Sequence, residues 1–364
     1  MNKKRIAYFM MIVYIVGFCL FFSVKAKAES EKKLGVEGFA FEVIQPENQQ
    51  NKEVGYFDLH LNPGQKQMVQ MKLKNTSEEQ IVLGVALNSA KTNSNGVIEY
   101  GPNNIPNDSS LKYDFSTIVE APKEVTLAPK SETMLDLNIK MPEEAFEGYI
   151  SGGIQLQEKD QDIKKENKGM IINKFAYLTG MLLSNSDSKN IEPKLEFNKI
   201  YPELSNYRNA IFVNFSNVTP IYVNDMTTEV TIMKKNSESV IYETKKTKMR
   251  MAPNTTINFP VPMNGEKMMS GDYKAKILVT TLSGGRWEWE KTFTISNDEA
   301  EKFNEQDLTL TQDSGVNWLL VGLIIATVLL LALLIFLLIR MKNKKKRTSQ
   351  KQQNKKRKNK NERK

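Results

Sequence analysis

The sequence offers few side chains that could catalyse a reaction. His60 is the only histidine and Cys19 the only cysteine, which excludes a histidine-pair zinc protease and a cysteine-ligated metal site. Glu143, Glu144 and Glu147 form a cluster of carboxylates. A glycosidase needs two carboxylates about 5–9 Å apart, but a surface helix or loop explains this group more simply. We expect no enzymatic activity, with a membrane-bound glycan-modifying enzyme as the least favoured alternative.

Asp58 with Asp108 or Asp114 could hold a calcium ion. A dedicated calcium loop carries carboxylates at alternating positions followed by a glycine and a later glutamate, and no stretch of the sequence has that full pattern. We therefore expect neither a metal ion nor another cofactor.

Polar and aromatic side chains near predicted turns are better candidates for ligand binding. Amides and aromatic rings suit glycans, because they offer hydrogen-bond partners and apolar faces for sugar rings. A purely structural role for each of these residues stays open. The candidates in the first half of the chain are Tyr56, Asp58, Gln65, Asn93, Asn95 and Tyr100.

The neighbouring glycines and prolines are typical of turns. Pro63 and Gly64 are expected to form a hairpin turn, and Gly96 to supply a positive φ after Asn95. Between Ser89 and Ser116 lies a long connection rich in Asn, Ser, Gly and Pro. Loops of this length are commonly functional, so we expect it to expose a face to a ligand.

These candidates need a scaffold, and alternation of apolar and polar residues predicts an antiparallel β-sandwich over residues 34–160. In the run 56–61 His60 falls on the polar, solvent-facing side. The apolar positions of the clearest runs are Phe57, Leu59 and Leu61; Val69, Met71 and Leu73; Ile81, Leu83, Val85 and Leu87; and Leu135, Leu137, Ile139 and Met141.

A charged, unpatterned stretch over 158–168 indicates a domain boundary, and alternation resumes from about residue 168 to 297. A second sandwich fits, beginning with the strand of Phe175 and Tyr177. Trp287 and Trp289 share one face of its last strand, as core residues or as anchors for a partner. Residues 298–317 are polar and acidic and are expected to form a stalk. The predicted class is all-β, with two immunoglobulin-like sandwiches.

Residues 318–339 form an apolar, uncharged stretch that ends at the basic residue Arg340. At 1.5 Å per residue, a helix of this length reaches about 33 Å, enough to cross a hydrocarbon core. Trp318 and Arg340 suit the two membrane interfaces, and the basic residues place the tail 340–364 in the cytoplasm. Everything before Trp318 would then lie outside the cell, anchored by a single span.

The beginning of the chain agrees with this topology. Lys3, Lys4 and Arg5 precede an apolar run, and Ala26 and Ala28 supply the small residues that a signal peptidase reads. We expect a signal peptide over 1–28 with cleavage after Ala28, and an uncleaved anchor as the alternative. The mature chain would then contain no cysteine and no disulfide.

The net charge differs among the three segments that the predicted topology defines. Residues 1–28 carry +5, residues 340–364 carry +13 and the segment between them carries −9, which gives the net charge of +9. The tail has no interleaved aromatic residues, so attraction to anionic lipid explains it better than nucleic-acid binding. We expect no nucleic-acid partner.

The chain also resembles a known family along nearly its whole length. The residues that carry the resemblance are Phe41 and Val43; Pro46, Glu47, Asn48 and Gln49; 55–59; Pro63, Gly64, Gln65 and Gln67; Thr92, Asn93, Asn95, Gly96 and Tyr100; 140–142; Gly148, Gly152 and Gly153; 173–177; 251–254; Gly271 and Tyr273; and Trp287 and Phe293. In order and spacing these residues resemble the WxL-interacting proteins of Gram-positive bacteria, which are membrane-anchored partners of WxL-domain surface proteins.

The resemblance implies a peptidoglycan-binding first domain and a host-binding second domain, both immunoglobulin-like. It implies a cell-surface scaffold or adhesin whose partners are peptidoglycan, WxL-domain proteins and host extracellular matrix proteins. Trp318, Leu319 and Leu320 spell W-x-L by chance, in our interpretation. An assembly chaperone for exported surface proteins is the alternative, and it would donate an exposed edge strand to its clients.

The predicted topology is tested by cell fractionation. No Leu-Pro-x-Thr-Gly string precedes the apolar stretch, where the chain runs from Leu310 to Gly315 without one. The protein should therefore stay in the membrane fraction of protoplasts until detergent is added. Release by muramidase alone would contradict the prediction.

Overall fold

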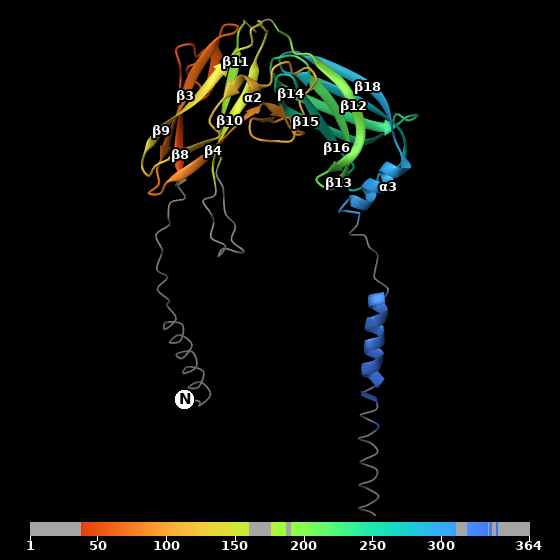
Figure 1. Cartoon of the computed structure of the whole chain (residues 1–364). Coiled ribbons are helices and arrows are strands. Elements are labelled where there is room, and N and C mark those ends of the chain that lie inside the picture. Colours follow the sequence, from red (N-terminus) through yellow and green to blue (C-terminus); the bar gives the residue numbers. More distant parts are fainter. Residues whose placement is uncertain are drawn as a thin grey trace, which may run out of the picture.

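The computed structural model describes residues 38–159, 176–186, 191–310, 319–333, 335–336 and 340. The expected signal peptide over 1–28 and the tail beyond residue 340 lie outside this part of the chain. The described residues form mostly β-strands, arranged in sheets whose pairs are nearly all antiparallel, with few helices (Figure 1).

The first module consists of two sheets that share one apolar core. Phe57, Met71 and Leu137 lie in this core with no exposed surface. One sheet has the order β1 (Phe39–Ile44), β3 (Lys66–Asn75), β9 (Glu132–Lys140) and β7 (Val119–Glu120). The other has the order β2 (Phe57–His60), β11 (Ala176–Ser184), β10 (Ile150–Glu158), β4 (Ile81–Ser89) and β8 (Glu124–Leu127).

The second module repeats this two-sheet plan around a core of its own. One sheet has the order β12 (Leu195–Ser205), β13 (Arg208–Asn217) and β16 (Thr255–Pro262). The other has the order β15 (Val240–Met251), β14 (Val223–Lys234), β17 (Gly271–Thr281) and β18 (Arg286–Ile295).

The alternation seen in the sequence predicts the faces of the strands correctly. In β3, Val69, Met71 and Leu73 are buried. In β2, Phe57 and Leu59 are buried while His60 is exposed. Because successive side chains of a strand point to opposite faces, the pattern determines which side meets the core.

The strand of Tyr177 differs from the prediction. It was expected to open the second sandwich, but β11 pairs antiparallel with β10 and parallel with β2. Met181 and Leu183 are fully buried in the first core. Alternation identifies the buried face of a strand but does not identify the strand beside it. β10 and β11 are consecutive strands, and consecutive strands usually pair with each other. The boundary expected at 158–168 therefore falls between two paired strands of the first module.

The stalk predicted over 298–317 also differs from the structure in its described part. Residues 297–306 form helix α3 (Asn297–Gln306), which starts with a capping box between Ser296 and Glu299. Ala300 is buried in the second core. Asn304 accepts a hydrogen bond from the backbone of Met268 at 2.7 Å. The polar, acidic residues after β18 therefore form a helix that packs on the second module.

No helix among the described residues is both long and apolar enough to span a membrane. The span expected over 318–339 includes Trp318 and residues 334 and 337–339, which lie outside the described part.

Pro63 and Gly64 form a turn, but not a hairpin. The carbonyl of Asn62 accepts a hydrogen bond from the amide of Gln65 at 3.1 Å, and Gly64 has a φ of 67°. Proline followed by a residue with positive φ is typical of a type II turn. The turn joins β2 in one sheet to β3 in the other, so it carries the chain across the sandwich.

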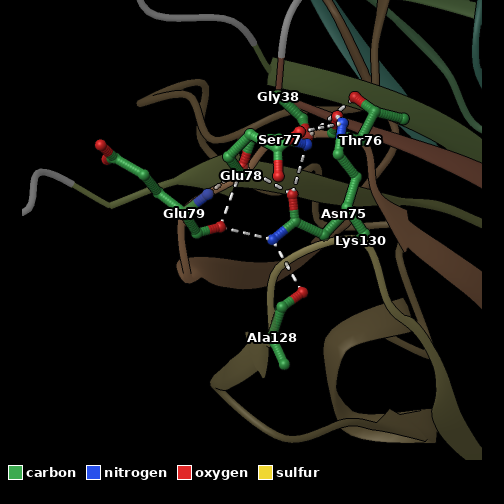
Figure 2. A network of polar contacts seen from close by, with 8 residues as sticks. All are labelled: Gly38, Asn75, Thr76, Ser77, Glu78, Glu79, Ala128 and Lys130. Atoms are coloured by element: carbon green, nitrogen blue, oxygen red, sulfur yellow. Dashed lines mark hydrogen bonds and ion pairs between the residues drawn. The ribbon is translucent and has the colours of Figure 1, made fainter.

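A buried asparagine fastens one end of the first module (Figure 2). Asn75 has no exposed surface, and its Nδ2 donates to the carbonyls of Glu79 and Ala128 at 2.8 and 2.9 Å. Its Oδ1 accepts from the amide and the hydroxyl of Ser77, both at 2.8 Å. One side chain therefore holds the turn after β3 against the turn before β9.

The second module uses the same asparagine clamp. Asn217 is fully buried, and its Nδ2 donates to the carbonyls of Ile221 and Ala252 at 2.7 and 3.0 Å. Its Oδ1 accepts from the hydroxyl of Thr219 at 2.6 Å. Lys130 in the first module and Asn254 in the second both have a positive φ, 50° and 49°. The two modules are therefore variants of one local design.

Removal of the first clamp should destabilise the protein. In Asn75→Ala the buried carbonyls and the Ser77 amide lose their partner, which costs about 2–4 kcal/mol. We expect a lower midpoint of urea unfolding, followed by circular dichroism. Asn138→Ala, which truncates an exposed asparagine of β9, is the control. Equal midpoints for the two variants would refute the role of the clamp.

Candidate functional site

Five amide side chains gather beside edge strand β2 and are called the amide cluster here: Asn48, Gln49, Gln50, Gln65 and Gln67. Gln49 is buried, and it shapes the segment that leads into β2. Its Nε2 donates to the carbonyl of Tyr56 at 2.9 Å, and its Oε1 accepts from the amide of Asp58 at 3.1 Å. A bridge between Gln49 and Leu59 extends this pairing.

Asn48, Gln65 and Gln67 present linked amide groups at this edge. Asn48 and Gln67 bond reciprocally, with Gln67 Nε2 2.8 Å from Asn48 Oδ1 and Asn48 Nδ2 3.1 Å from Gln67 Oε1. Gln65 Nε2 donates to the same Gln67 oxygen at 3.1 Å. All three are half-buried, so the network is fixed in place and still reaches solvent.

Asp58 extends the amide cluster along β2. Gln50 Nε2 lies 3.4 Å from Asp58 Oδ1 and 3.0 Å from the hydroxyl of Ser184 in β11. Burial raises the pKa of Asp58. Ser184 also lies 3.4 Å from Nδ1 of His60. Asp58 and His60 alternate with core residues, so their side chains lie on the outer face of β2, whereas Gln67 is in phase with the buried residues of β3 in the other sheet.

Tyr56 and Tyr100 continue this outer face toward the second module. A Cβ on Gly153 would lie 2.5 Å from Tyr100, and one on Gly180 would lie 3.8 Å from Tyr56. The two glycines pair across β10 and β11, and they leave room for the backbone of Tyr100 and the side chain of Tyr56. Burial, and then the charge of Asp58, raise the pKa of Tyr56.

Asn93 and Asn95 belong to a small hairpin between β5 (Lys91–Thr92) and β6 (Ile98–Glu99). Asn93 Oδ1 accepts from the amides of Asn95 and Val97 at 2.9 and 3.1 Å, and Gly96 has the expected positive φ of 68°. Asn95 Oδ1 accepts from Lys246 of the second module at 2.6 Å. Both asparagines therefore lie where the modules meet, away from the amide cluster.

The connection 89–116 was expected to expose a face to a ligand, but much of it docks on the second module. Thr92 is buried; its Oγ1 lies 2.7 Å from Thr255 Oγ1 and accepts from the amide of Ala252 at 3.0 Å. Asn254 Nδ2 donates to the carbonyl of Ser110 at 3.1 Å. Polar composition matches this role, because such an interface is built from hydrogen bonds.

Tyr222 and Gly148 complete this interface. The Tyr222 hydroxyl lies 3.2 Å from that of Tyr100 and also bonds Ser151. At Gly148, a Cβ would lie 2.2 Å from the carbonyl oxygen of Pro220. Only glycine allows the two backbones to approach so closely.

Trp287 and Trp289 lie on the core-facing side of β18 and are partly buried against the second core. The Trp289 ring lies 5.9 Å from that of Phe215 and 6.3 Å from that of Phe197. The structure therefore favours core packing over an exposed anchor for these tryptophans.

Asp108 and Asp114 accept hydrogen bonds from neighbouring side chains. Asp108 accepts from Ser216 and Ser110, and Asp114 accepts from Ser89 and Asn107. Within the described ranges no group of three or more histidine, cysteine or carboxylate residues is placed to hold a metal ion.

Sequence reasoning missed several members of this surface. Asn48 and Gln50 carried a signal, because they belong to a run of four amides, 48–51, a few residues before β2. Ser184 and Tyr222 carried none, since Ser184 lies 134 residues from Gln50 and Tyr222 lies 122 residues from Tyr100.

Comparison with family models decides the relationship of the chain. Residues 39–158 match the peptidoglycan binding domain of the WxL Interacting Protein, and residues 166–305 match its host binding domain. The chain belongs to the WxL-interacting protein family. The second match begins before β11, although that strand packs in the first module of this WxL-interacting protein.

Solved structures resemble the chain only distantly, and no curated protein matches its sequence. The CupB2 chaperone of Pseudomonas aeruginosa is 13% identical, with 64% of this chain and 95% of that chain covered and a TM-score of 0.26. The E. coli chaperone DraB is 11% identical, with 71% and 98% covered and a TM-score of 0.27. Likenesses at this level carry no functional argument.

The carboxyl group of Asp114, in the connection 89–116, makes the stability of the fold depend on pH. Burial raises the pKa of this carboxyl, but hydrogen bonds from Ser116, Ser89 and Asn107 outweigh it and lower the pKa to about 2. Because its pKa is lowered in the folded state, ionised Asp114 stabilises the fold at pH values above the ordinary pKa of 3.8. This contribution is lost as the pH falls toward 2. Because Asp114 is partly exposed, we expect about 1 kcal/mol.

Asp114→Asn keeps an oxygen that can accept the cap bond from Ser116, removes the charge and loses the oxygen that accepts from Asn107. The unfolding free energy of the wild type should exceed that of the variant at pH 7 and approach it between pH 4 and pH 2. Glu120→Gln, at an exposed carboxyl of β7, serves as the control. A difference between wild type and Asp114→Asn that does not change with pH would contradict the assignment.

Proposed function

We propose that this WxL-interacting protein is a non-enzymatic scaffold on the surface of a Gram-positive cell. Its first module binds peptidoglycan, and the protein acts together with WxL-domain proteins. Its second module binds host extracellular matrix components. The match of residues 39–158 to the family's peptidoglycan binding domain carries the proposal.

The chemistry of the amide cluster supports glycan binding. Peptidoglycan is rich in acetamido groups, hydroxyls and peptide bonds, and amide side chains both donate and accept hydrogen bonds to such groups. The reciprocal pair of Asn48 and Gln67 holds these groups in one arrangement, which lowers the entropy cost of binding. Tyr56 adds an aromatic ring close to Asp58, just before β2.

The topology of the proposal comes from the sequence. A signal peptide over 1–28, a single span over 318–339 and a cytoplasmic basic tail would hold both modules outside the membrane. The two-sheet plan of each module supports an immunoglobulin-like assignment.

An assembly chaperone is the second candidate, and one observation favours it. Among the described residues β18 pairs only with β17, so its other edge could accept a client strand. Lys291 opposes this use, since it lies on the core-facing side of β18 with its Nζ 5.2 Å from the Phe197 ring. Inward charges on an edge disfavour strand addition. Hydrogen exchange showing β18 protected only with a client would favour the chaperone.

The proposal is tested by sedimentation with purified peptidoglycan. The full chain in detergent micelles should co-sediment, and Gln67→Ala should bind about 5–30-fold more weakly, because one or two hydrogen bonds are lost and the network loosens. Asn138→Ala, which changes an amide on β9, should bind like the wild type. A wild-type protein that stays in the supernatant would refute the proposal.

A further inference from the structure

A cleft between the two modules has the form of a second recognition site. It has a volume of about 350 Å³, and both modules line it. Small-ligand sites commonly have volumes of about 300–1,000 Å³ and often lie between domains. The side chains that matter for the inference are Lys112, Tyr113, Phe146, Glu147, Tyr149 and Pro220.

Aromatic rings dominate one wall of the cleft. The rings of Tyr113 and Phe146 lie 5.5 Å apart, and Lys112 Nζ lies 5.0 Å from the centre of the Tyr113 ring. Asn185 fixes the Phe146 segment by accepting a hydrogen bond from its amide at 2.9 Å. The opposite wall comes from the second module through Pro220, whose carbonyl accepts from the amide of Tyr149 at 2.8 Å.

Polar groups inside the cleft already have partners, whereas the rim carries charges. The hydroxyl of Ser110 accepts from Asn254 at 3.1 Å, and Ser89 donates to Asp114 at 2.8 Å. Glu147 is exposed at the rim, and Lys112 bonds Glu144 there at 2.8 Å. A ligand would therefore meet apolar faces inside and charged or hydrogen-bonding groups outside.

We propose that this cleft binds one N-acetylated sugar unit of a glycan chain. A pyranose ring has an apolar C–H face that suits Tyr113 and Phe146, and its rim hydroxyls can bond Glu147 and Lys112. The inference rests on the proposed function of the first module and adds a contact site distinct from the amide cluster. Because residues of both modules form the walls, the site exists only in the docked arrangement.

The test uses the full chain in detergent micelles and a tetrasaccharide of N-acetylglucosamine, with binding measured by calorimetry. Phe146→Ala should weaken binding about ten-fold, the loss expected for one stacking ring. Leu111→Trp, which adds bulk to the cleft wall, should abolish it. Phe197→Ala removes a half-buried ring of the second module and should bind like the wild type. Unchanged affinity in both cleft variants would overturn the proposal.

A second measurement needs no variant. Carbodiimide labelling of Glu147 should slow several-fold in the presence of the tetrasaccharide, while labelling of Glu120 should not change. Equal labelling of Glu147 with and without sugar would overturn the proposal. So would protection of Glu147 by an alanine-containing stem peptide and not by the tetrasaccharide, because the cleft would then be a peptide site. If the wild type still sediments with peptidoglycan in these cases, the proposed function stands without the cleft.

Discussion

Hydrogen bonding between the connection 89–116 and the second module holds the molecule in one arrangement. Thr92, Ala252 and Thr255 are buried at this contact, and their polar groups bond one another. Separation of the modules would return these groups to water, whereas a small shift would leave them buried without partners, at about 1–3 kcal/mol each. The interface therefore favours one geometry over neighbouring ones, and the cleft beside it depends on that geometry.

The docking surface of the second module is a modified copy of the asparagine clamp. In the first module the clamp turn ends in Lys130, whose amide donates to the carbonyl of Ser77 at 3.2 Å (Figure 2). In the second, Asn254 takes that place, and its amide donates to the carbonyl of Thr219 at 3.1 Å. The Asn254 side chain then reaches Ser110 of the first module. A feature that stabilises one module thus also joins the two.

The sequence predicted what depends on local pattern. Strand faces followed from alternation, as the buried Leu59 and exposed His60 show, and the positive φ of Gly96 followed from its turn. The partner of β11 could not be predicted, because a pattern of period two does not encode which strand lies beside it. Helix α3 was missed since few of its side chains are buried.

The candidate site was predicted in part for the same reason. Asp58 lies on β2 and contacts Gln50 of the amide cluster, Tyr56 directly precedes β2, and Gln65 belongs to the cluster. Asn93 and Asn95 lie at the module interface, where Asn95 contacts Lys246, 151 residues further along the chain. Such contacts leave no local signal in a single sequence.

The central claim, that the two modules form one fixed unit, is tested most directly by a distance measurement between them. The mature chain is expected to lack cysteine, so Met68→Cys on β3 and Leu282→Cys beyond β17, both at exposed side chains, can carry a pair of spin labels. Pulsed electron resonance on the full chain should give one narrow distance distribution. A broad distribution, or several separate distances, would show that the modules move independently and would contradict the account.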